Sequence, residues 1–114
     1  MAQVFNLFRV SSTTIGTGDI TLGPAITGFL TFTQAGGSDG DRIEYSINDG
    51  NNSEKGVGTI TSGILTRDFV YSSTNGGALI NLSGNSATCN IFCDPSAQHL
   101  WVINTGQHSV YGGI

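Results

Sequence analysis

The side chains that could carry chemistry are few, and two cysteines stand out among them. Cys89 and Cys93 are four residues apart in a segment that reads as a strand. Their Cα atoms are then expected about 13 Å apart, whereas a disulfide spans at most about 7 Å. His99 follows downstream, but this CxxxC spacing lacks the second ligand pair of a metal site. The pattern predicts two buried or half-buried thiols, with no metal and no cofactor.

Catalytic patterns are also sparse. The serines are many, but no spacing gives His99 or His108 a partner that a nucleophile would need. The stretch from Ile15 to Gly18 lacks the third glycine of a dinucleotide fingerprint, since Thr21 stands there and no helix pattern follows, so this stretch is predicted to be a turn. The chain is therefore expected not to be an enzyme, although a glycosidase carboxylate pair remains open from sequence alone.

Two acidic loops, 35–41 and 48–52, raise the question of calcium. An EF-hand loop places its oxygen ligands at alternate positions and ends on a distant Glu, and neither loop has this spacing. Asp, Asn and Gly are also the residues that tight turns prefer, because they tolerate positive φ or bond their own backbone. Turn chemistry is the interpretation of both loops.

The composition favours short strands joined by turns. The chain has 114 residues with 17 glycines, only 11% charged residues and 38% hydrophobic residues. This length suits one domain with one core, and six Phe and three Tyr can fill it. The predicted fold is all-β: a single antiparallel β-sandwich or barrel-like domain with a central three-stranded meander and short hairpin turns.

The meander is predicted from Asp41 to Asn75. In its first strand Ile43, Tyr45 and Ile47 alternate with polar residues, the period of a strand with one wet face. A second strand is expected at about 54–61 and a third at 64–71, with turns at 48–52 and 62–63. In the third strand the alternation assigns Leu65, Arg67, Phe69 and Tyr71 to one face.

Other strands are predicted on both sides of the meander. The N-terminal segment 1–12 is expected to be a strand or an extended arm, and 13–95 the core. Within the core, strands are expected at 19–22, 29–33, 78–82 and 87–93. The segment 96–114 is expected to be a C-terminal hairpin or tail.

Four aromatic residues are the candidate contacts with a partner or glycan: Phe5 and Phe8 in the N-terminal segment, and Trp101 and Tyr111 in the C-terminal one. Trp101 is expected to anchor the core or a subunit interface, and a sugar-stacking role is the alternative.

The charge distribution limits the class of partner. The net charge is −4, and the four basic residues are scattered along the chain. Nucleic acid and anionic membranes both attract clustered cations, so neither is expected as a partner. No signal peptide and no membrane-spanning apolar run is recognised, which predicts synthesis in a cytoplasm.

Three segments between Arg9 and Pro95 follow one another as strand-and-turn units. They are IGTGDITLGPAITGFLTF, DGDRIEYSINDGNNSEKGVGTI and TSGILTRDFVYSSTNGGALINLSGNSATCNIFCDP. An Arg-Val pair and a Thr-rich stretch precede the first. In this order they resemble a family of small β-rich virion proteins of tailed bacteriophages, in which similar segments occur as stand-alone proteins and as the opening domain of tail fibres.

The resemblance implies a role in the virion and no catalytic residues. Fibre members continue into long shafts, whereas this sequence stops at Ile114, which favours a small accessory protein. The expected function is capsid decoration or cementing, through contacts with the major capsid protein or other virion proteins, as a homo-oligomer with a trimer favoured. The alternative is a tail, neck or fibre component that acts as an adaptor or binds a host glycan.

Overall fold

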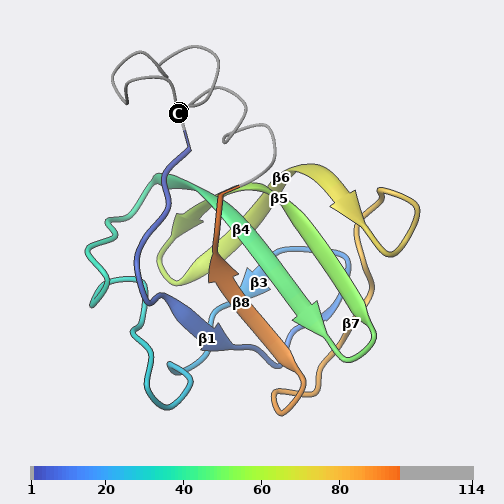
Figure 1. Ribbon diagram of the computed structural model, residues 1–114, viewed down its shortest axis with the longest axis horizontal. Helices are drawn as coiled ribbons and strands as arrows, with labels where there is room; N and C mark the ends of the chain where they lie inside the picture. The colour runs from blue at the N-terminus through green and yellow to red at the C-terminus, as the bar shows by residue number, and fades with distance from the viewer. Residues whose placement is uncertain (1, 96–114) are drawn as a thin grey trace, which may run out of the picture.

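The computed structural model describes residues 2–95, and this part of the chain is all-β. Six strands form one antiparallel sheet in the order β1-β8-β4-β5-β6-β3, and two short strands form a second sheet (Figure 1). The strands are β1 (Arg9–Ser11), β2 (Ile15–Gly16), β3 (Ile20–Thr21), β4 (Asp41–Asp49), β5 (Asn52–Thr61), β6 (Ile64–Ser73), β7 (Leu82–Ser83) and β8 (Cys89–Cys93).

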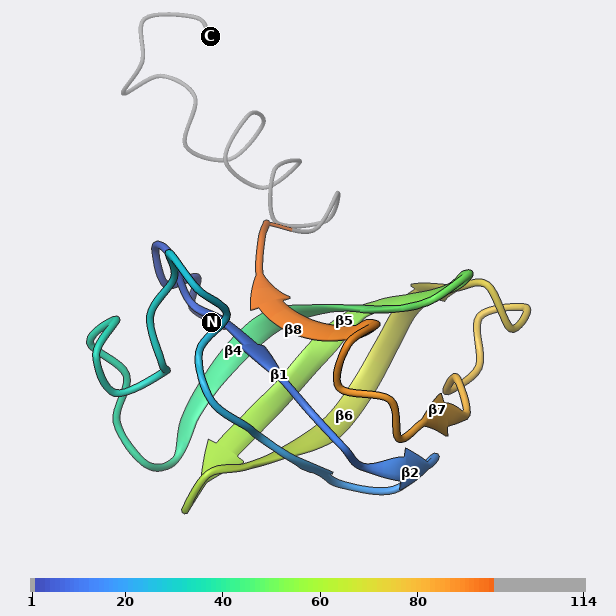
Figure 2. The ribbon, with the colours of Figure 1, turned by 90° about the horizontal axis from the view of Figure 1, so that it is seen from below.

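The six-stranded sheet curls into a half-barrel. Figure 2 shows β4, β5 and β6 curving round, with β2 and β7 at the open side of the curl. β1 and β3, at the two ends of the sheet order, are only three and two residues long. The prediction of an all-β, barrel-like fold around a central meander is confirmed.

The meander consists of β4, β5 and β6, and its turns are those that the sequence predicts. Residues 50 and 51 join β4 to β5, and Gly50 has a φ of 62°. Ser62 and Gly63 join β5 to β6 with φ values of 52° and 75°. Positive φ at both central residues is the geometry of a type I′ hairpin turn, whose twist matches that of its strands.

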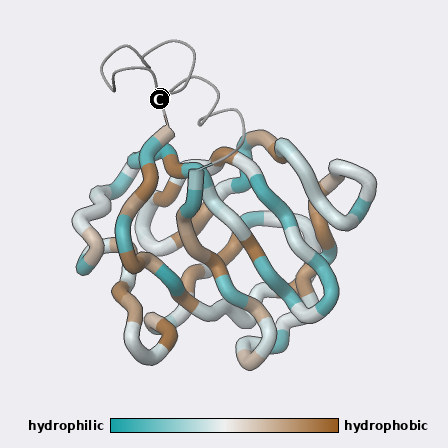
Figure 3. The backbone as a smooth tube through the Cα atoms, in the orientation of Figure 1, coloured by the Kyte–Doolittle hydropathy of each residue, from teal (hydrophilic) through white to brown (hydrophobic). Residues whose placement is uncertain are grey.

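The hydrophobic core lies on the concave, inner face of the sheet. Ile43, Tyr45 and Ile47 of β4 point into it, as their alternation predicts. Apolar and polar segments alternate along the strands in Figure 3. The inner face also receives side chains from every neighbouring strand, and the buried cluster includes Val10, Ile20, Ile60, Leu65, Cys89 and Ile91.

Two β-bulges in β6 overturn the predicted division of its faces. The register with β5 shifts between Lys55 and Gly56 and again between Val57 and Gly58, so Asp68 and Tyr71 have no paired partner on β5. An extra residue reverses the alternation beyond it. Leu65 and Arg67 therefore face inward, while Phe69 is 58% exposed.

Three local predictions were wrong. Residues 32–36 form a turn, because the Thr31 and Gln34 side chains each bond the other's backbone N–H, so the predicted strand 29–33 is reduced to an isolated bridge at Leu30. The predicted strand 78–82 is reduced to its last residue, in β7. Ile15–Gly16, predicted as a turn, is β2 and pairs with β7.

The N-terminal segment belongs to the packed structure. Phe8 and Val10 lie in the core cluster, and Gln3 forms a parallel bridge to Ile43 of β4. Of the two alternatives predicted for segment 1–12, the strand is present as β1 at one end of the sheet. The predicted C-terminal hairpin lies outside the described residues.

A buried charged network ties the meander to its surrounding loops. Glu54 and Arg67 form an ion pair of 3.0 Å, and their side chains are 0% and 1% exposed. Arg67 also donates to the carbonyl oxygens of Gly16, Gly18 and Ile80. A buried charge is tolerated when its hydrogen bonds are satisfied, and here they fix the loops against the sheet.

Candidate functional site

One residue from each of five neighbouring strands lies in a single row across the outer, convex face of the sheet. Arg9 of β1 is paired with Phe92 of β8, Phe92 with Ser46 of β4, Ser46 with Lys55 of β5, and Lys55 with Ser72 of β6. Adjacent strands are about 4.8 Å apart, so this row, here called the outer-face row, spans about 19 Å.

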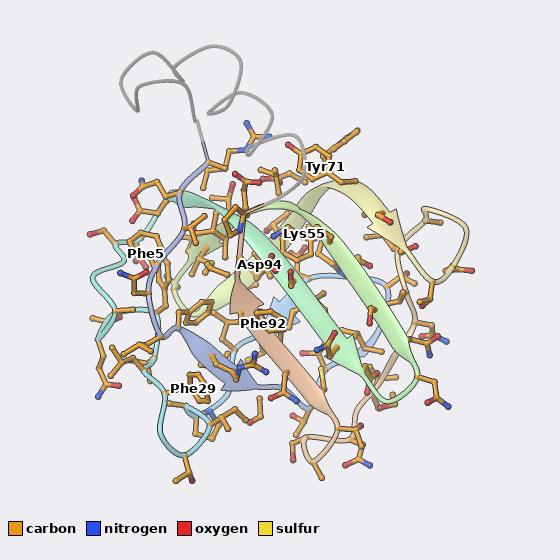
Figure 4. The ribbon with its side chains drawn as sticks, in the orientation of Figure 1. Phe5, Phe29, Lys55, Tyr71, Phe92 and Asp94 are labelled. Atoms are coloured by element: carbon orange, nitrogen blue, oxygen red, sulfur yellow. The ribbon has the colours of Figure 1, made fainter. Side chains whose placement is uncertain are left out.

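An ion pair forms the middle of the outer-face row. Lys55 Nζ donates to Asp94 Oδ1 at 2.8 Å and also to the Asp94 carbonyl oxygen, and Ser46 Oγ donates to the same carboxylate oxygen at 3.0 Å. Figure 4 shows Lys55 beside Asp94, with Phe92 farther along β8. Lys55 is 19% exposed and Asp94 54% exposed. The pair thus offers a donor and an acceptor side by side to solvent.

The electrostatics of Asp94 follow from these contacts. Partial burial alone raises the pKa of this carboxyl, but hydrogen bonds from Lys55 and Ser46 and the charge of Lys55 outweigh it, so the pKa lies below 3.8. Asp94 is therefore ionised at neutral pH, and the pair persists.

A groove of about 470 Å³ lies along this part of the sheet, within the size range of small-ligand sites. Side-chain hydroxyls and the Asn48 amide form the polar part of its wall together with the Lys55–Asp94 pair, and Phe92 lies at one end. Its polar lining residues include Ser46, Asn48, Ser53, Ser72 and Thr74. Such a wall suits a ligand that itself both donates and accepts hydrogen bonds.

Arg9 lies at the end of the row between two phenyl rings. Its guanidinium carbon is 4.1 Å from the centroid of the Phe92 ring and 5.1 Å from that of Phe29. Cation–π contacts hold the group in place. Among residues 2–95 the guanidinium has no hydrogen-bond partner and no carboxylate within ion-pair distance, and its Nε is buried.

The structure describes two of the four aromatic residues that the sequence singled out, Phe5 and Phe8, and neither belongs to the outer-face row. Phe8 is 2% exposed and packs edge-on against Phe32, so proposing it as a surface contact was wrong: its ring is part of the core. Phe5 is half-buried, with its ring 5.1 Å from that of Phe32. Trp101 and Tyr111 lie outside the described residues.

The row itself was not predicted from sequence. Its members come from positions 9, 46, 55, 72 and 92, and only strand register brings them together. The alternation of a strand puts Ser46 and Phe92 on the face opposite to the buried Ile47 and Ile91. The wet face expected of β4 is in part covered, since Ser46 is 8% exposed beneath the Lys55–Asp94 pair.

Other chemistry-bearing groups are dispersed or enclosed. Within 2–95, no three His, Cys, Asp or Glu side chains gather as metal ligands would. Cys89 and Cys93 are both free thiols, as predicted, and burial raises the pKa of each to about 11. No helix in the described part is long and apolar enough to span a bilayer.

Large apolar side chains are exposed at several places on the surface, and Ile15 of β2 is among them. Phe69 of β6 contacts Tyr71 edge-on, with ring centroids 5.3 Å apart. β3 pairs with β6 only at Ile64 and Leu65, so the rest of this edge has no second strand beside it within the described residues. Leu7 and Phe29 are also exposed, and the Leu7 carbonyl accepts a hydrogen bond from Leu30 N–H.

No protein-family model matches this chain, and neither the curated proteins nor the solved structures contain a match to it.

Proposed function

We propose that this protein is a structural component of a tailed-bacteriophage virion, and specifically a capsid decoration or cement protein. It works by binding other virion proteins, foremost the major capsid protein. The resemblance of residues 9–95 to small virion proteins supports this role, and so does the exposed Phe69 on the open edge of β6. An exposed apolar side chain on a rigid sheet edge suits a protein interface.

Self-association follows from the same surface. The open part of the β6 edge offers main-chain groups to a neighbouring copy, and Phe69 and Tyr71 offer apolar area. A trimer is the favoured assembly. Binding of the protein then stabilises the capsid shell by mass action.

Immunogold electron microscopy of intact virions tests the location. Label over the head is the expected result, and the protein should be present in the mass spectrum of purified particles. Label confined to the neck or tail would refute decoration, and absence from the particles would refute any virion role.

The substitution Phe69→Ser tests the interface. Because Phe69 is largely exposed, the folded monomer should keep its melting temperature, while the fraction of oligomer or of shell-bound protein falls. Leu7→Ser is the matched control at another exposed apolar position. Equal assembly by Phe69→Ser and the unmodified chain would remove the β6 edge from the proposal.

A second candidate function is a tail, neck or fibre component that binds a host glycan. The observation that favours it is the groove beside the outer-face row, with its hydroxyl, amide and Lys55–Asp94 wall. A carbohydrate hydroxyl both donates and accepts, which matches a donor and an acceptor held side by side.

A further inference from the structure

Building on the glycan-binding candidate, we infer that the outer-face row binds an acidic oligosaccharide, with a sugar carboxylate seated on Arg9. Hydroxyl groups of the same ligand occupy the groove beside Lys55 and Asp94. The ligand crosses the strands, since the row runs from β1 to β6.

The state of Arg9 is the first observation behind this inference. Guanidinium groups present five donors in a fixed fork, which a carboxylate can engage with two parallel bonds. Arg9 donates none of them within the described residues, although Phe29 and Phe92 hold it in position. A preorganised cation without a partner in an acidic protein points to an anionic group from another molecule.

The other cations of the described chain make Arg9 distinct. Arg67 is enclosed with Glu54, and Lys55 is paired with Asp94. Arg42 is exposed on the same face of the sheet, but no aromatic ring lies over it. Arg9 is thus the cation that is both held in place and free to bind.

The second observation is the strand register. The pairing of β8 with β1 and β4 places Arg9 next to the groove. Phe92 stacks on Arg9 and also lines the groove, and its other strand partner is Ser46, beneath the Lys55–Asp94 pair. Ser72, at the far end, is exposed and its hydroxyl has no partner within residues 2–95. An anion site and a hydroxyl-binding site are therefore continuous.

Sheet geometry favours a sugar over an acidic peptide. A peptide gains most by pairing its main chain along a strand edge, whereas on this face the backbone groups are already used in the ladder. A ligand lying across the strands meets side chains only. Ring hydroxyls find partners in such a wall, but most peptide N–H and C=O groups do not.

The test measures binding by NMR chemical-shift titration of the full chain. Probes are trigalacturonate, a sialyl-trisaccharide and a hyaluronan hexasaccharide, with the methyl ester of trigalacturonate as the neutral match and hexaglutamate as the acidic peptide. At least one acidic sugar should shift the signals of residues along the row and bind about tenfold more tightly than a neutral match.

Variants locate the carboxylate. Arg9→Gln should weaken acidic-sugar binding about tenfold, while Arg42→Gln, which removes the same charge from the same face, should leave it within about twofold. Arg9→Lys should recover part of the affinity, because the charge returns without the fork. Circular dichroism melting verifies that each variant is folded.

The outcomes separate this inference from the glycan-binding candidate. If the neutral ester binds as well as the acid, or Arg9→Gln binds as well as the unmodified chain, glycan binding stands and the role of Arg9 is refuted. If no sugar shifts the row, both fail. Binding of hexaglutamate alone would also overturn the inference, in favour of a protein partner.

Discussion

Tyr45 donates a hydrogen bond of 2.6 Å to Glu54 Oε2 inside the half-barrel, among the hydrophobic side chains of the core. The other carboxylate oxygen accepts from Arg67 at 3.0 Å and from the Ile80 N–H at 2.8 Å. Both oxygens are thus satisfied, and one acidic residue links β4, β5, β6 and the segment before β7. The stability of the fold should depend strongly on it.

Removing the charge of Glu54 should be costly. In Glu54→Gln, Arg67 stays buried without a counter-charge, so we expect a loss of about 3–5 kcal/mol in the free energy of unfolding. Urea denaturation measures this loss in the free energy of unfolding. Asp19→Asn, at an exposed carboxylate with no described hydrogen bond, is the control and should change little. Equal curves for the two variants would contradict the assigned role.

Alkaline pH should unfold the protein through Tyr45. Burial, and then the bond to Glu54, raise the pKa of this phenol far above its usual 10.0. Below pH 10.0 Tyr45 is protonated in both the folded and the unfolded protein. Above pH 10.0 only the unfolded protein loses this proton, so the free energy of unfolding falls as the pH rises. The expected slope is about 1.4 kcal/mol per pH unit.

The variant Tyr45→Phe isolates this contribution. It should be less stable at neutral pH because Glu54 loses a donor, yet its stability should fall less steeply above pH 10.0. Cys89 and Cys93 contribute equally to both proteins and cancel in the difference. If the stability of the two proteins fell equally steeply with pH, the assigned role of Tyr45 in alkaline unfolding would be contradicted.

Gly56 makes the room that the Tyr45 ring occupies. A Cβ at this position would lie 2.6 Å from Tyr45 Oη and would also collide with the carbonyl oxygen of Phe69. Gly56→Ala should therefore destabilise the protein by about 1–3 kcal/mol or more in thermal or urea unfolding. Gly18→Ala is the matched control, since a methyl group added at Gly18 would meet no atom within 4 Å.

The two thiols should react slowly in the native protein. The thiolate is the nucleophile, and burial raises the pKa of both thiols to about 11. With a disulfide reagent at pH 8, half-buried Cys93 should react before fully buried Cys89, and denaturant should make both react at once. Immediate reaction of two thiols without denaturant would contradict this burial.

Alternation and turn chemistry were enough to predict the centre of the fold. Ile43, Tyr45 and Ile47 mark the buried face of β4, and the Ser62–Gly63 turn fixes the register of the next hairpin. These are local signals, with a period of two residues and a turn that demands positive φ. Local signals cannot show a bulge, and the bulge at Asp68 turned Phe69 outward.

The candidate site could not be predicted in this way. Arg9 and Phe92 are far apart in sequence and are joined only because β8 lies between β1 and β4. The buried ion pair of Glu54 and Arg67 could not be predicted either. Charged residues in strands are usually exposed to solvent, so the sequence gives no sign that these two are buried. Both features depend on long-range pairing, which the composition of each strand does not encode.

The position of Arg67 in the chain has a consequence for the order of folding. Gly18 and Gly16, whose carbonyls it binds, precede it by 49 and 51 positions, whereas Glu54 is 13 away. Closing the longer loops costs more entropy, so we expect the meander to form first and the loop carbonyls to close over the guanidinium late. Contacts made after the rate-limiting step act chiefly on unfolding. Arg67 should therefore set how long the folded molecule persists more than how fast it forms.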